Sequence, residues 1–298
     1  NKNIGKFHGL SFYRHLYVLT KLRHVIITGG AGGIGTHISR ALVDDGFKVL
    51  VIGRNQTKFD KLYESINNKD SIEFFQLNVA LVKDVSVFFR SINNSHHRLF
   101  ALINCFGTQI PIGNFSKIDT EEWVNNISVN LLGTSNMIRG SIPFLVGENN
   151  PGKIINFSGG GGTSSRPNFS AYAVSKTAIV RLTEILAEES KDSQIDINVV
   201  APGPINTGML EDILEAGMKS GKEFEEALER KKRGGESPKK IVDLCRFLLS
   251  KESDGISGKL ISAVWDDYRD PSFLERLKFD PDFCCLRRVD GTNFDRQQ

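Results

Sequence analysis

The sequence predicts an α/β protein with a single domain, built on one doubly wound parallel sheet of seven strands. Short β-branched apolar runs alternate with amphipathic stretches, which is the pattern of parallel strands joined by crossover helices. The 298 residues can bury one sizeable core, and no internal repeat or low-complexity linker divides them. The predicted strands, in chain order, span residues 24–29, 48–53, 72–79, 99–107, 153–159, 196–203 and 259–265.

Two predicted helices between these strands carry apolar residues at steps of three and four, which places one face of each helix in the core. The first begins after Gly35 and ends at Gly46, because glycine favours the turn that closes a helix. The expected core residues are Ile38, Ala41 and Leu42 in the first helix, and Trp123, Ile127, Leu131, Thr134 and Ile138 in the second.

Three segments flank the predicted sheet domain of residues 23–265 or stand off from it. Residues 1–22 form an aromatic-rich extension that lacks a signal-peptide cleavage site. Residues 207–233 follow a Pro-Gly turn and are predicted to be charged helices, either a solvated face or a lid over the substrate. The C-terminal tail, residues 266–298, alternates aromatic and charged residues, and we expect it to pack over the domain or a neighbouring subunit.

Composition argues against several kinds of partner. The net charge of +3 arises from 38 basic and 35 acidic residues, which is too even a balance for a nucleic-acid-binding surface. No apolar run approaches the roughly 20 residues that span a bilayer, so we expect no membrane association. The four cysteines show neither metal-ligand spacing nor a disulfide framework, which favours a cytoplasmic protein without a metal site.

A glycine-rich turn, TGGAGGIG, occupies residues 28–35 between the first predicted strand and the first predicted helix. Glycines allow the backbone to turn sharply beside a pyrophosphate, and the start of a helix offers unpaired N–H groups to it. We therefore expect the cofactor to contact Thr28, Gly29, Gly33, Ile34 and Gly35, the alternative being a tight turn without a ligand.

The end of the second predicted strand indicates which dinucleotide binds. An acidic side chain there would bind the ribose 2′-hydroxyl and repel a 2′-phosphate. This chain instead has Gly53 followed by Arg54, and a guanidinium pairs well with phosphate. Arg54 therefore favours NADP, and a merely solvated Arg54 would leave NAD as the alternative cofactor.

Tyr172 and Lys176 lie four residues apart on a predicted helix, so their side chains emerge on the same face. A nearby ammonium favours the phenolate and lowers the tyrosine pKa toward the range useful for proton transfer. The pair suits a general acid that protonates a carbonyl oxygen while a hydride reaches the carbon. The spacing alone is common on helices.

Together, these motifs resemble the short-chain dehydrogenase/reductase family over residues 24–265. TGGAGGIG is similar to the family's Thr-Gly-x-x-x-Gly-x-Gly, YAVSK to its Tyr-x-x-x-Lys, ISVNLLG to its mid-helix asparagine motif, and APGPINT to its Pro-Gly turn. The resemblance implies a Rossmann-type sheet, a nicotinamide cofactor and a homodimer or homotetramer.

The resemblance also implies roles for single residues. Tyr172 becomes the acid/base, and Lys176 binds the nicotinamide ribose and tunes the tyrosine. Asn130 holds a proton-relay water. The turn after the sixth strand contributes Pro202 and Gly203, the backbone of Ile205, and Thr207 near the nicotinamide carboxamide.

Two departures from the family pattern concern the cofactor site. The family's Asn-Asn-Ala-Gly is NCFG here, which keeps Asn104 and Gly107 but places Phe106 beside the adenosine ribose, where it narrows or shifts the wall. The acidic residue after the third strand is Asn78, which we assign to the adenine together with Val79. Asn78 accepts from the adenine amino group only through its carbonyl oxygen.

A third departure concerns catalysis. The family's serine, 13 residues before the tyrosine, falls at Gly159, the first of four consecutive glycines, and Ser158 lies one position early. Three interpretations stay open. A bulge brings Ser158, or less favourably Ser164 or Ser165, into the serine's role. Alternatively, glycine N–H groups or a bulky substrate replace the serine. In the third, catalysis is lost and the protein only binds cofactor.

These observations predict an NADP(H)-preferring oxidoreductase that transfers a hydride between nicotinamide and a small carbonyl or alcohol substrate. The catalytic residues would be Tyr172, Lys176, Asn130 and Ser158. A sugar or sugar-nucleotide oxidoreductase or epimerase is the alternative enzyme. A catalytically decayed, cofactor-binding regulatory protein is the alternative outside enzymes.

Overall fold

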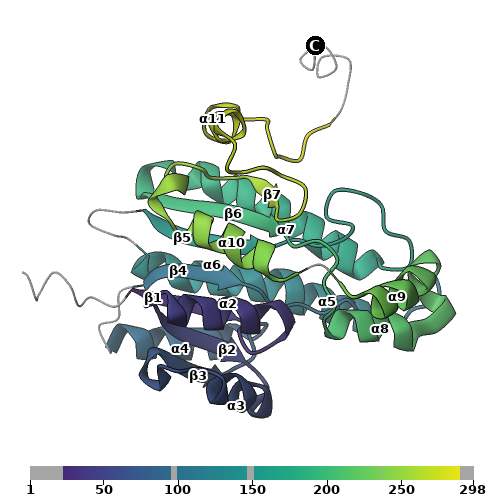
Figure 1. The fold of residues 1–298 in the computed structure, drawn as a ribbon. Coiled ribbons are helices and arrows are strands. Elements are labelled where there is room, and N and C mark those ends of the chain that lie inside the picture. Colours follow the sequence, from purple (N-terminus) through teal and green to yellow (C-terminus); the bar gives the residue numbers. More distant parts are fainter. Residues whose placement is uncertain (1–22, 95–98, 146–150, 236, 289–298) are drawn as a thin grey trace, which may run out of the picture.

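A computed structural model describes residues 23–94, 99–145, 151–235 and 237–288, and its centre is a parallel sheet of seven strands (Figure 1). The strand order is β3-β2-β1-β4-β5-β6-β7, so the winding direction reverses between β1 and β4. This confirms the predicted doubly wound, Rossmann-type fold. The strands are β1 (His24–Thr28), β2 (Lys48–Gly53), β3 (Ile72–Gln76), β4 (Leu99–Asn104), β5 (Gly152–Phe157), β6 (Ile195–Ala201) and β7 (Leu260–Ser262).

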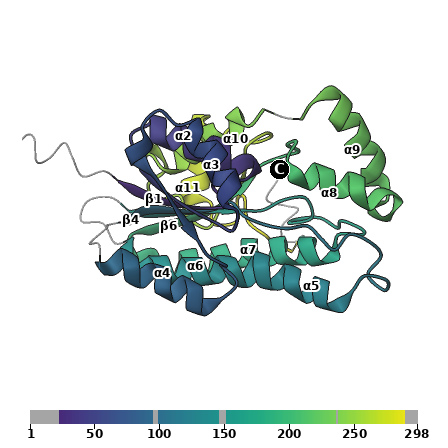
Figure 2. The ribbon, with the colours of Figure 1, turned by 90° about the horizontal axis from the view of Figure 1, so that it is seen from below.

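Helices cover both faces of the sheet (Figure 2). On one face lie α2 (Gly33–Asp44), α3 (Gln56–Glu64), α10 (Lys239–Leu248) and α11 (Pro271–Phe279). On the other lie α4 (Val82–Asn94), α5 (Thr120–Ile127), α6 (Gly133–Ser141) and α7 (Ser170–Glu189).

The alternation of side chains along each strand divides the core between the two faces. In β1, Val25 and Ile27 belong to the cluster under α2 and α10, whereas Ile26 belongs to the cluster under α4 and α6. All three side chains are buried. A strand covered on both faces explains why the sequence shows continuous apolar runs instead of alternation.

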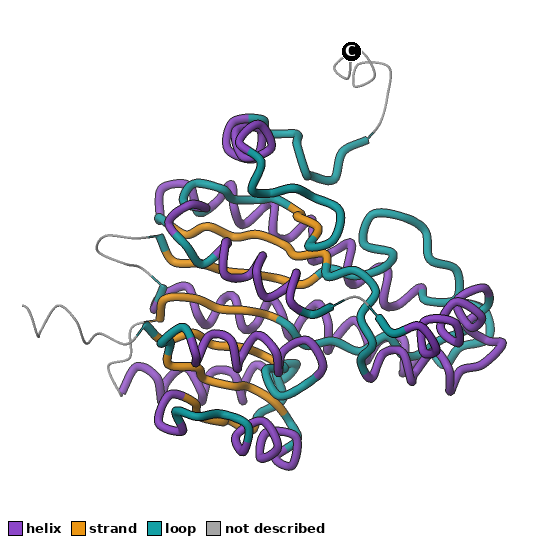
Figure 3. Tube along the Cα trace, viewed as in Figure 1, coloured by secondary structure: helices purple, strands orange, loops and turns teal. Residues whose placement is uncertain are grey.

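All of the observed strands except β2 end earlier than predicted. The predicted strand 99–107 is β4 (Leu99–Asn104), and the predicted strand 259–265 is β7 (Leu260–Ser262). The residues that follow these strands form loops at the carboxyl edge of the sheet. Figure 3 shows these loops gathered at the edge from which α8 (Gly208–Ala216) and α9 (Lys222–Arg233) project.

The tail packs on the domain as far as residue 288, and the extension 1–22 lies outside the described residues. The buried Lys259 donates from Nζ to the carbonyl oxygens of Asp280, at 2.6 Å, and Phe283, at 3.0 Å. The backbone N–H of Leu286 donates to the carboxylate of Glu184 on α7 at 2.6 Å. These contacts hold the tail against β7 and α7.

Candidate active site

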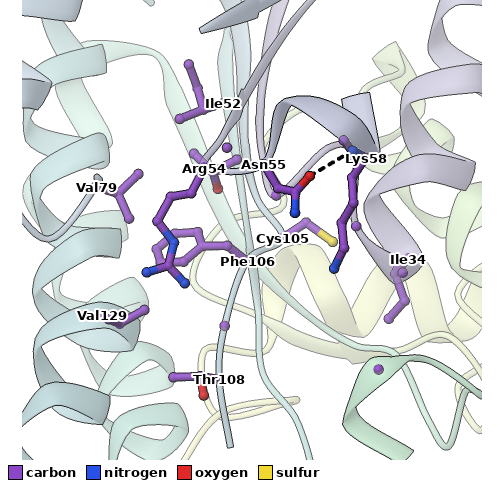
Figure 4. A pocket seen from close by; sticks show the side chains of 18 of the residues that line it. Ile34, Ile52, Arg54, Asn55, Lys58, Val79, Cys105, Phe106, Thr108 and Val129 are labelled. Atoms are coloured by element: carbon purple, nitrogen blue, oxygen red, sulfur yellow. Dashed lines mark hydrogen bonds between the residues drawn. The ribbon is translucent and has the colours of Figure 1, made fainter. Parts of the chain in front are cut away.

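A cavity of about 740 Å³ opens at the carboxyl ends of β1, β2 and β4, the position at which open α/β sheets bind ligands (Figure 4). It includes many of the residues predicted to bind the cofactor. Those that line it are Thr28, Gly29, Gly33, Ile34, Arg54, Asn78, Val79, Gly107 and Thr207.

The glycine turn allows α2 to start close to the end of β1. A Cβ added to Gly35 would lie 2.2 Å from the carbonyl oxygen of Gly29, so only glycine fits there. Unlike α3, which Asn55 caps, α2 has no side-chain hydrogen bond at its N-cap, Gly32. Its first turn therefore presents N–H groups without a side-chain acceptor, and this arrangement fits a phosphate group.

Two basic side chains extend into the cavity at the β2 end (Figure 4). Arg54 follows β2, and Lys58 lies one turn further on, in α3, whose N-terminus Asn55 caps by accepting the Lys58 N–H at 2.9 Å. The sequence analysis did not single out Lys58, although its spacing of four from Arg54 was a usable signal. The two cations make this end of the cavity suitable for an additional anionic group.

Asn78 and Phe106 also line the cavity. The side-chain oxygen of Asn78 accepts the N–H of Ala80 at 3.1 Å, and thus serves its own turn. The Phe106 ring lies against Gly133 of α6, where an added Cβ would be 3.1 Å from the end of the ring. The predicted narrowing by Phe106 thus takes the form of a ring that lines the cavity between β4 and α6.

Asn104 lies behind the cavity, in a buried chain of hydrogen bonds through the sheet. The Thr28 hydroxyl donates to Asn104 Oδ1 at 3.2 Å, Asn104 Nδ2 donates to Asn156 Oδ1 at 2.9 Å, and Asn156 Nδ2 donates to the Thr183 hydroxyl at 2.9 Å. This chain links β1, β4, β5 and α7. Asn104 therefore fixes the strands on which the site is built, and its role as a cofactor ligand remains a prediction.

Asn130 lies in a π-helical turn, η2 (Ser128–Leu132), which interrupts the predicted continuous helix between α5 and α6. Asn130 Nδ2 donates to the carbonyl oxygen of Thr108, at 2.8 Å, and to the hydroxyl of Ser175, at 3.0 Å. Its Oδ1 accepts the Thr108 N–H at 2.9 Å. π-turns are frequent at functional sites, and this one holds a buried amide beside the loop after β4.

Lys176 and Tyr172 project from α7 toward this same region. Lys176 Nζ lies 5.6 Å from the centre of the Tyr172 ring and donates to the carbonyl oxygen of Phe157 at 2.9 Å. Gly107, which lines the cavity, is the meeting point: a Cβ added there would lie 3.3 Å from Asn130 Oδ1 and 3.4 Å from Lys176 Nζ. The structure thus brings Asn130 and Lys176 to one end of the cavity.

Burial dominates the ionisation of both side chains. It raises the pKa of Tyr172 to about 12, an effect that the positive charge of Arg166 opposes and the negative charge of Glu223 adds to. Burial also lowers the pKa of Lys176 to about 8, although the nearby Cys105 acts to raise it. The sequence analysis expected the Lys176 ammonium to lower the tyrosine pKa, whereas in the structure that pKa is raised because burial outweighs the neighbouring charges. The sequence also missed Arg166, which no motif spacing singles out.

Gly159 lies against the tyrosine hydroxyl, and the serine beside it points elsewhere. A Cβ added to Gly159 would lie 2.1 Å from Tyr172 Oη. The Ser158 hydroxyl instead lies against Gly162, where an added Cβ would be 2.2 Å from it. Between these two described residues, no hydrogen bond joins the Ser158 and Tyr172 hydroxyls. The catalytic role of Ser158 therefore remains a prediction that this geometry does not support.

The turn after β6 leads directly to the two projecting helices. Gly203, next to Pro202, has a φ of +76°, and Ile205 packs against the core under α2 and α10. Thr207 caps α8 by accepting the Met209 N–H at 3.4 Å, and its methyl group packs against Gly33 of α2. This turn connects the glycine-rich end of the cavity to the segment 207–233.

The segment 207–233 lies over the tyrosine. Its buried side chains Leu210, Ile213 and Ala227 form a small apolar cluster with Phe169 and Tyr172. Tyr172 is only 5% exposed as a result of this packing and its place in α7. These helices are positioned as a lid would be, and their opening and closing remain a prediction.

The described part of the chain contains no group of three or more His, Cys, Asp or Glu placed to hold a metal ion. None of its helices is long and apolar enough to cross a membrane.

Comparison with known proteins identifies the family. Residues 23–217 match the short chain dehydrogenase family. A diacetyl reductase, (S)-acetoin forming, from Staphylococcus aureus is 30% identical over 263 residues, which cover 82% of this chain and 96% of that protein. A 3-oxoacyl-acyl-carrier-protein reductase from Thermotoga maritima is 28% identical over 239 residues, covering 79% and 94%.

Solved structures agree with this assignment. That of ElxO is 25% identical to this chain, with a TM-score of 0.70, and the similarity covers 81% of this chain and 97% of that one. The chain therefore belongs to the short-chain dehydrogenase/reductase family and is an NAD(P)-dependent oxidoreductase.

Proposed function

We propose that this protein is an NADP(H)-preferring carbonyl reductase or alcohol dehydrogenase in which Tyr172 is the acid/base. One observation carries the proposal: a single cavity extends from the cations Arg54 and Lys58 to Gly107, where Lys176 and Asn130 meet. A dinucleotide needs anion-binding groups at one end and proton-transfer groups at the other. The cavity offers the anion-binding groups in its lining. Lys176 and Asn130 lie directly behind its Gly107 end, and Tyr172 lies beside Lys176.

The residues present fit a nicotinamide dinucleotide. The first turn of α2, which lacks a side-chain cap, would hold the pyrophosphate, and Asn78 and Val79 would flank the adenine. Arg54 and Lys58 would pair with a 2′-phosphate, and Gly53 leaves no carboxylate at the end of β2 to repel it. ElxO, at 25% identity, has been solved with NADPH bound, which supports NADP over NAD.

Tyr172 and its neighbours supply the proton chemistry. The cofactor, when bound, delivers or removes the hydride at the carbon of the substrate. In reduction, the Tyr172 hydroxyl donates its proton to the carbonyl oxygen, so that a C–H bond and an O–H bond form together and phenolate remains. Lys176 favours that phenolate, and Asn130 anchors the water that returns the proton. Oxidation of the alcohol runs these transfers in reverse.

Gly159 favours an oxyanion contact other than a serine hydroxyl. The position that faces Tyr172 Oη has no side chain. A backbone N–H group of Gly159 or of the glycine after it could then take the place of the serine hydroxyl, whereas the N–H of Gly162 already donates to the carbonyl oxygen of Gly159. Removal of one oxyanion donor reduces rates by about 10²- to 10³-fold, so slow turnover is expected. The relatives suggest small diketones and 3-oxoacyl thioesters as substrates. The family suggests a homodimer or homotetramer, and the cysteine pattern of the sequence favours a cytoplasmic location.

Tyr172→Phe tests the proposal. NADPH oxidation is followed with diacetyl and with a 3-oxoacyl thioester, and NADPH affinity is measured separately by fluorescence. Loss of the acid should reduce kcat by about 10²- to 10⁴-fold with little change in NADPH affinity. Equal turnover by the variant would reject Tyr172 as the acid/base. NADPH binding without any turnover by the wild-type protein would favour the regulatory alternative.

Arg54→Ala and Lys58→Ala test the choice of cofactor. Each should weaken NADPH binding by about tenfold or more and leave NADH binding nearly unchanged, because only NADPH carries the 2′-phosphate. Lys61→Ala is the matched control, since Lys61 is exposed on α3 and does not line the cavity. If both cofactors weaken equally, the preference for NADP is wrong.

A further inference from the structure

Arg166, in the loop between β5 and α7, lies as close to the predicted acid/base as Lys176 does. Its guanidinium carbon is 5.3 Å from the centre of the Tyr172 ring, compared with 5.6 Å for Lys176 Nζ. The same carbon lies 3.8 Å above the ring of Phe169, which is completely buried. A cation stacked on a buried ring is desolvated and held in place. Two cations, not one, therefore flank Tyr172.

Glu223 of α9 pairs with this arginine through both carboxylate oxygens. Arg166 Nε donates to Oε1 at 2.6 Å and Nη2 donates to Oε2 at 2.5 Å. The side chains are 13% and 25% exposed, which distinguishes this pair from the fully hydrated ion pairs of the surface. The pair joins the loop before α7 to the segment 207–233.

An apolar cluster packs α8 and α9 against the tyrosine. Phe169 and Tyr172 pack against Leu210 and Ile213 of α8 and against Ala227 of α9. A substrate that reaches the Tyr172 hydroxyl must pass this cover, because the tyrosine is 5% exposed. Glu223 belongs to α9, whereas Phe169, on which Arg166 is stacked, lies at the N-cap of α7.

The charged groups that face Tyr172 come from three elements. Lys176 lies on its own helix, α7, Arg166 on the preceding loop, and Glu223 on α9. The Arg166 charge opposes the rise in the pKa of Tyr172 that burial causes, and the Glu223 charge adds to that rise. The two partners of one ion pair thus act on the phenol in opposite directions.

We propose that Arg166 is a positioning residue for Tyr172, and that Glu223 couples it to α9. The guanidinium packs the tyrosine side chain in place and favours its phenolate, while the carboxylate of Glu223 partly neutralises that charge when α9 covers the site. This inference rests on the proposed function, in which Tyr172 is the acid/base. Through the Arg166–Glu223 pair, the proton affinity of Tyr172 would depend on the position of α9.

The test compares the ionisation of Tyr172 in variants of the full chain. Tyrosines labelled with ¹³C at Cζ are followed by NMR, and Tyr172→Phe assigns its resonance among the five tyrosines of the sequence. The variants are Arg166→Met, Arg166→Gln and Glu223→Gln. All are measured at the highest common pH at which circular dichroism shows the wild-type fold. The control, Glu211→Gln, breaks an exposed ion pair with Lys231 in the same segment.

The direction in which the ionisation of Tyr172 changes in each variant distinguishes an electrostatic role of the ion pair from a structural one. The phenolate-to-phenol ratio of Tyr172 should fall about tenfold in Arg166→Met, rise in Glu223→Gln and stay unchanged in Glu211→Gln. If the Arg166–Glu223 pair only held α9 in place, loss of either partner would expose the tyrosine. The phenolate-to-phenol ratio would then shift in the same direction in both variants. A shift in one direction in both variants, or no shift in either, would overturn the proposal.

Arg166→Gln keeps the inference testable if Arg166→Met does not fold. Glutamine retains a hydrogen-bond donor toward Glu223 but no charge, and it is expected to lower the ratio as methionine does. An unchanged ratio in Arg166→Gln would overturn the electrostatic role. The titration needs neither cofactor nor substrate. Full turnover by Tyr172→Phe would therefore reject the proposed function, whereas a wrong ionisation order would reject only this inference.

Discussion

At the scale of single residues, the four-glycine run at residues 159–162 is explained by packing. A Cβ at Gly159 would meet the Tyr172 hydroxyl at 2.1 Å, one at Gly161 would meet Ala173 Cβ at 2.7 Å, and one at Gly162 would meet the Ser158 hydroxyl at 2.2 Å. Gly160 is different, since its nearest neighbour would be 3.5 Å away. Three of the four glycines are thus required by close approach of the loop to α7 and to itself.

Gly159→Ala should therefore displace Tyr172, whereas Gly160→Ala should be tolerated. We expect the first to lower the free energy of unfolding by about 1–3 kcal/mol and to reduce kcat, and the second to change both far less. Urea denaturation and steady-state kinetics measure these effects. In a Tyr172→Phe background the stability loss should shrink, because the hydroxyl is the nearest atom. An equal loss with and without the hydroxyl would contradict this explanation.

The buried Lys176 opposes folding through its charge. Burial lowers its pKa to about 8, so folding is opposed at neutral pH by the work of burying the ammonium. Lys176→Met should raise the free energy of unfolding at pH 7 by about 2 kcal/mol while abolishing turnover.

The pH dependence checks the cause of this gain. The folded pKa lies below the unfolded one, so the penalty is complete below pH 8 and disappears as the pH rises toward the pKa of the unfolded lysine. The gain should accordingly shrink in urea titrations above pH 8. A constant gain at every pH would mean that packing, not charge, is responsible.

At the scale of secondary structure elements, a buried ion cluster fastens β5 to β6 at the edge opposite the site. Lys153 Nζ lies 2.7 Å from a carboxylate oxygen of Asp196 and 2.7 Å from one of Asp254, and the lysine side chain is 3% exposed. Asp254 follows α10 in the chain, so the cluster also anchors the connection into β7. It fixes the two strands whose carboxyl ends carry the glycine loop and the turn before α8.

Lys153→Met should lower the free energy of unfolding by about 3–5 kcal/mol, because it leaves Asp196 buried without its partner. Lys191→Met, which breaks an ion pair exposed at both ends, should cost less than about 1 kcal/mol. Urea denaturation of both variants makes the comparison. A double variant that also carries Asp196→Asn should recover part of the loss. Equal effects of the two single changes would refute a special role for the buried cluster.

At the scale of the whole molecule, the sheet and the segment 207–233 differ in how firmly they are held. Every residue of β5 is buried, whereas α8 and α9 bury only Leu210, Ile213 and Ala227 among their described side chains. Segments with few buried apolar contacts open at lower free energy than the core. We therefore expect the segment 207–233 to open at lower free energy than the sheet.

Hydrogen exchange should reveal this difference directly. Amides of α8 and α9 should exchange before those of β4 and β5, because local opening of the cover does not require unfolding of the sheet. Glu223→Gln should accelerate exchange in α9 and leave β5 unchanged, as measured by mass spectrometry of peptides. Simultaneous exchange of the cover and the sheet would show that they open as one unit.

The sequence by itself determined the sheet, its winding and part of the cavity, including its glycine turn and Arg54. Apolar runs alternating with helices, the glycine turn at residues 28–35 and the Tyr172–Lys176 spacing depend on local chemistry, which a linear pattern records. The exact strand ends were not predictable, since the loops at the carboxyl edge are shaped by contacts with distant helices. The same holds for the π-turn at Asn130, which interrupts an otherwise regular helical pattern.

Only the tertiary structure decided what surrounds the tyrosine. Arg166 and Glu223 are 57 residues apart, and no spacing rule connects a loop before α7 with the start of α9. The orientation of Ser158 and the contact of Gly159 with Tyr172 likewise depend on how the loop after β5 packs on α7. Sequence patterns report which groups are available. Desolvation and charge pairing depend on distances through space, and the folded chain alone sets those.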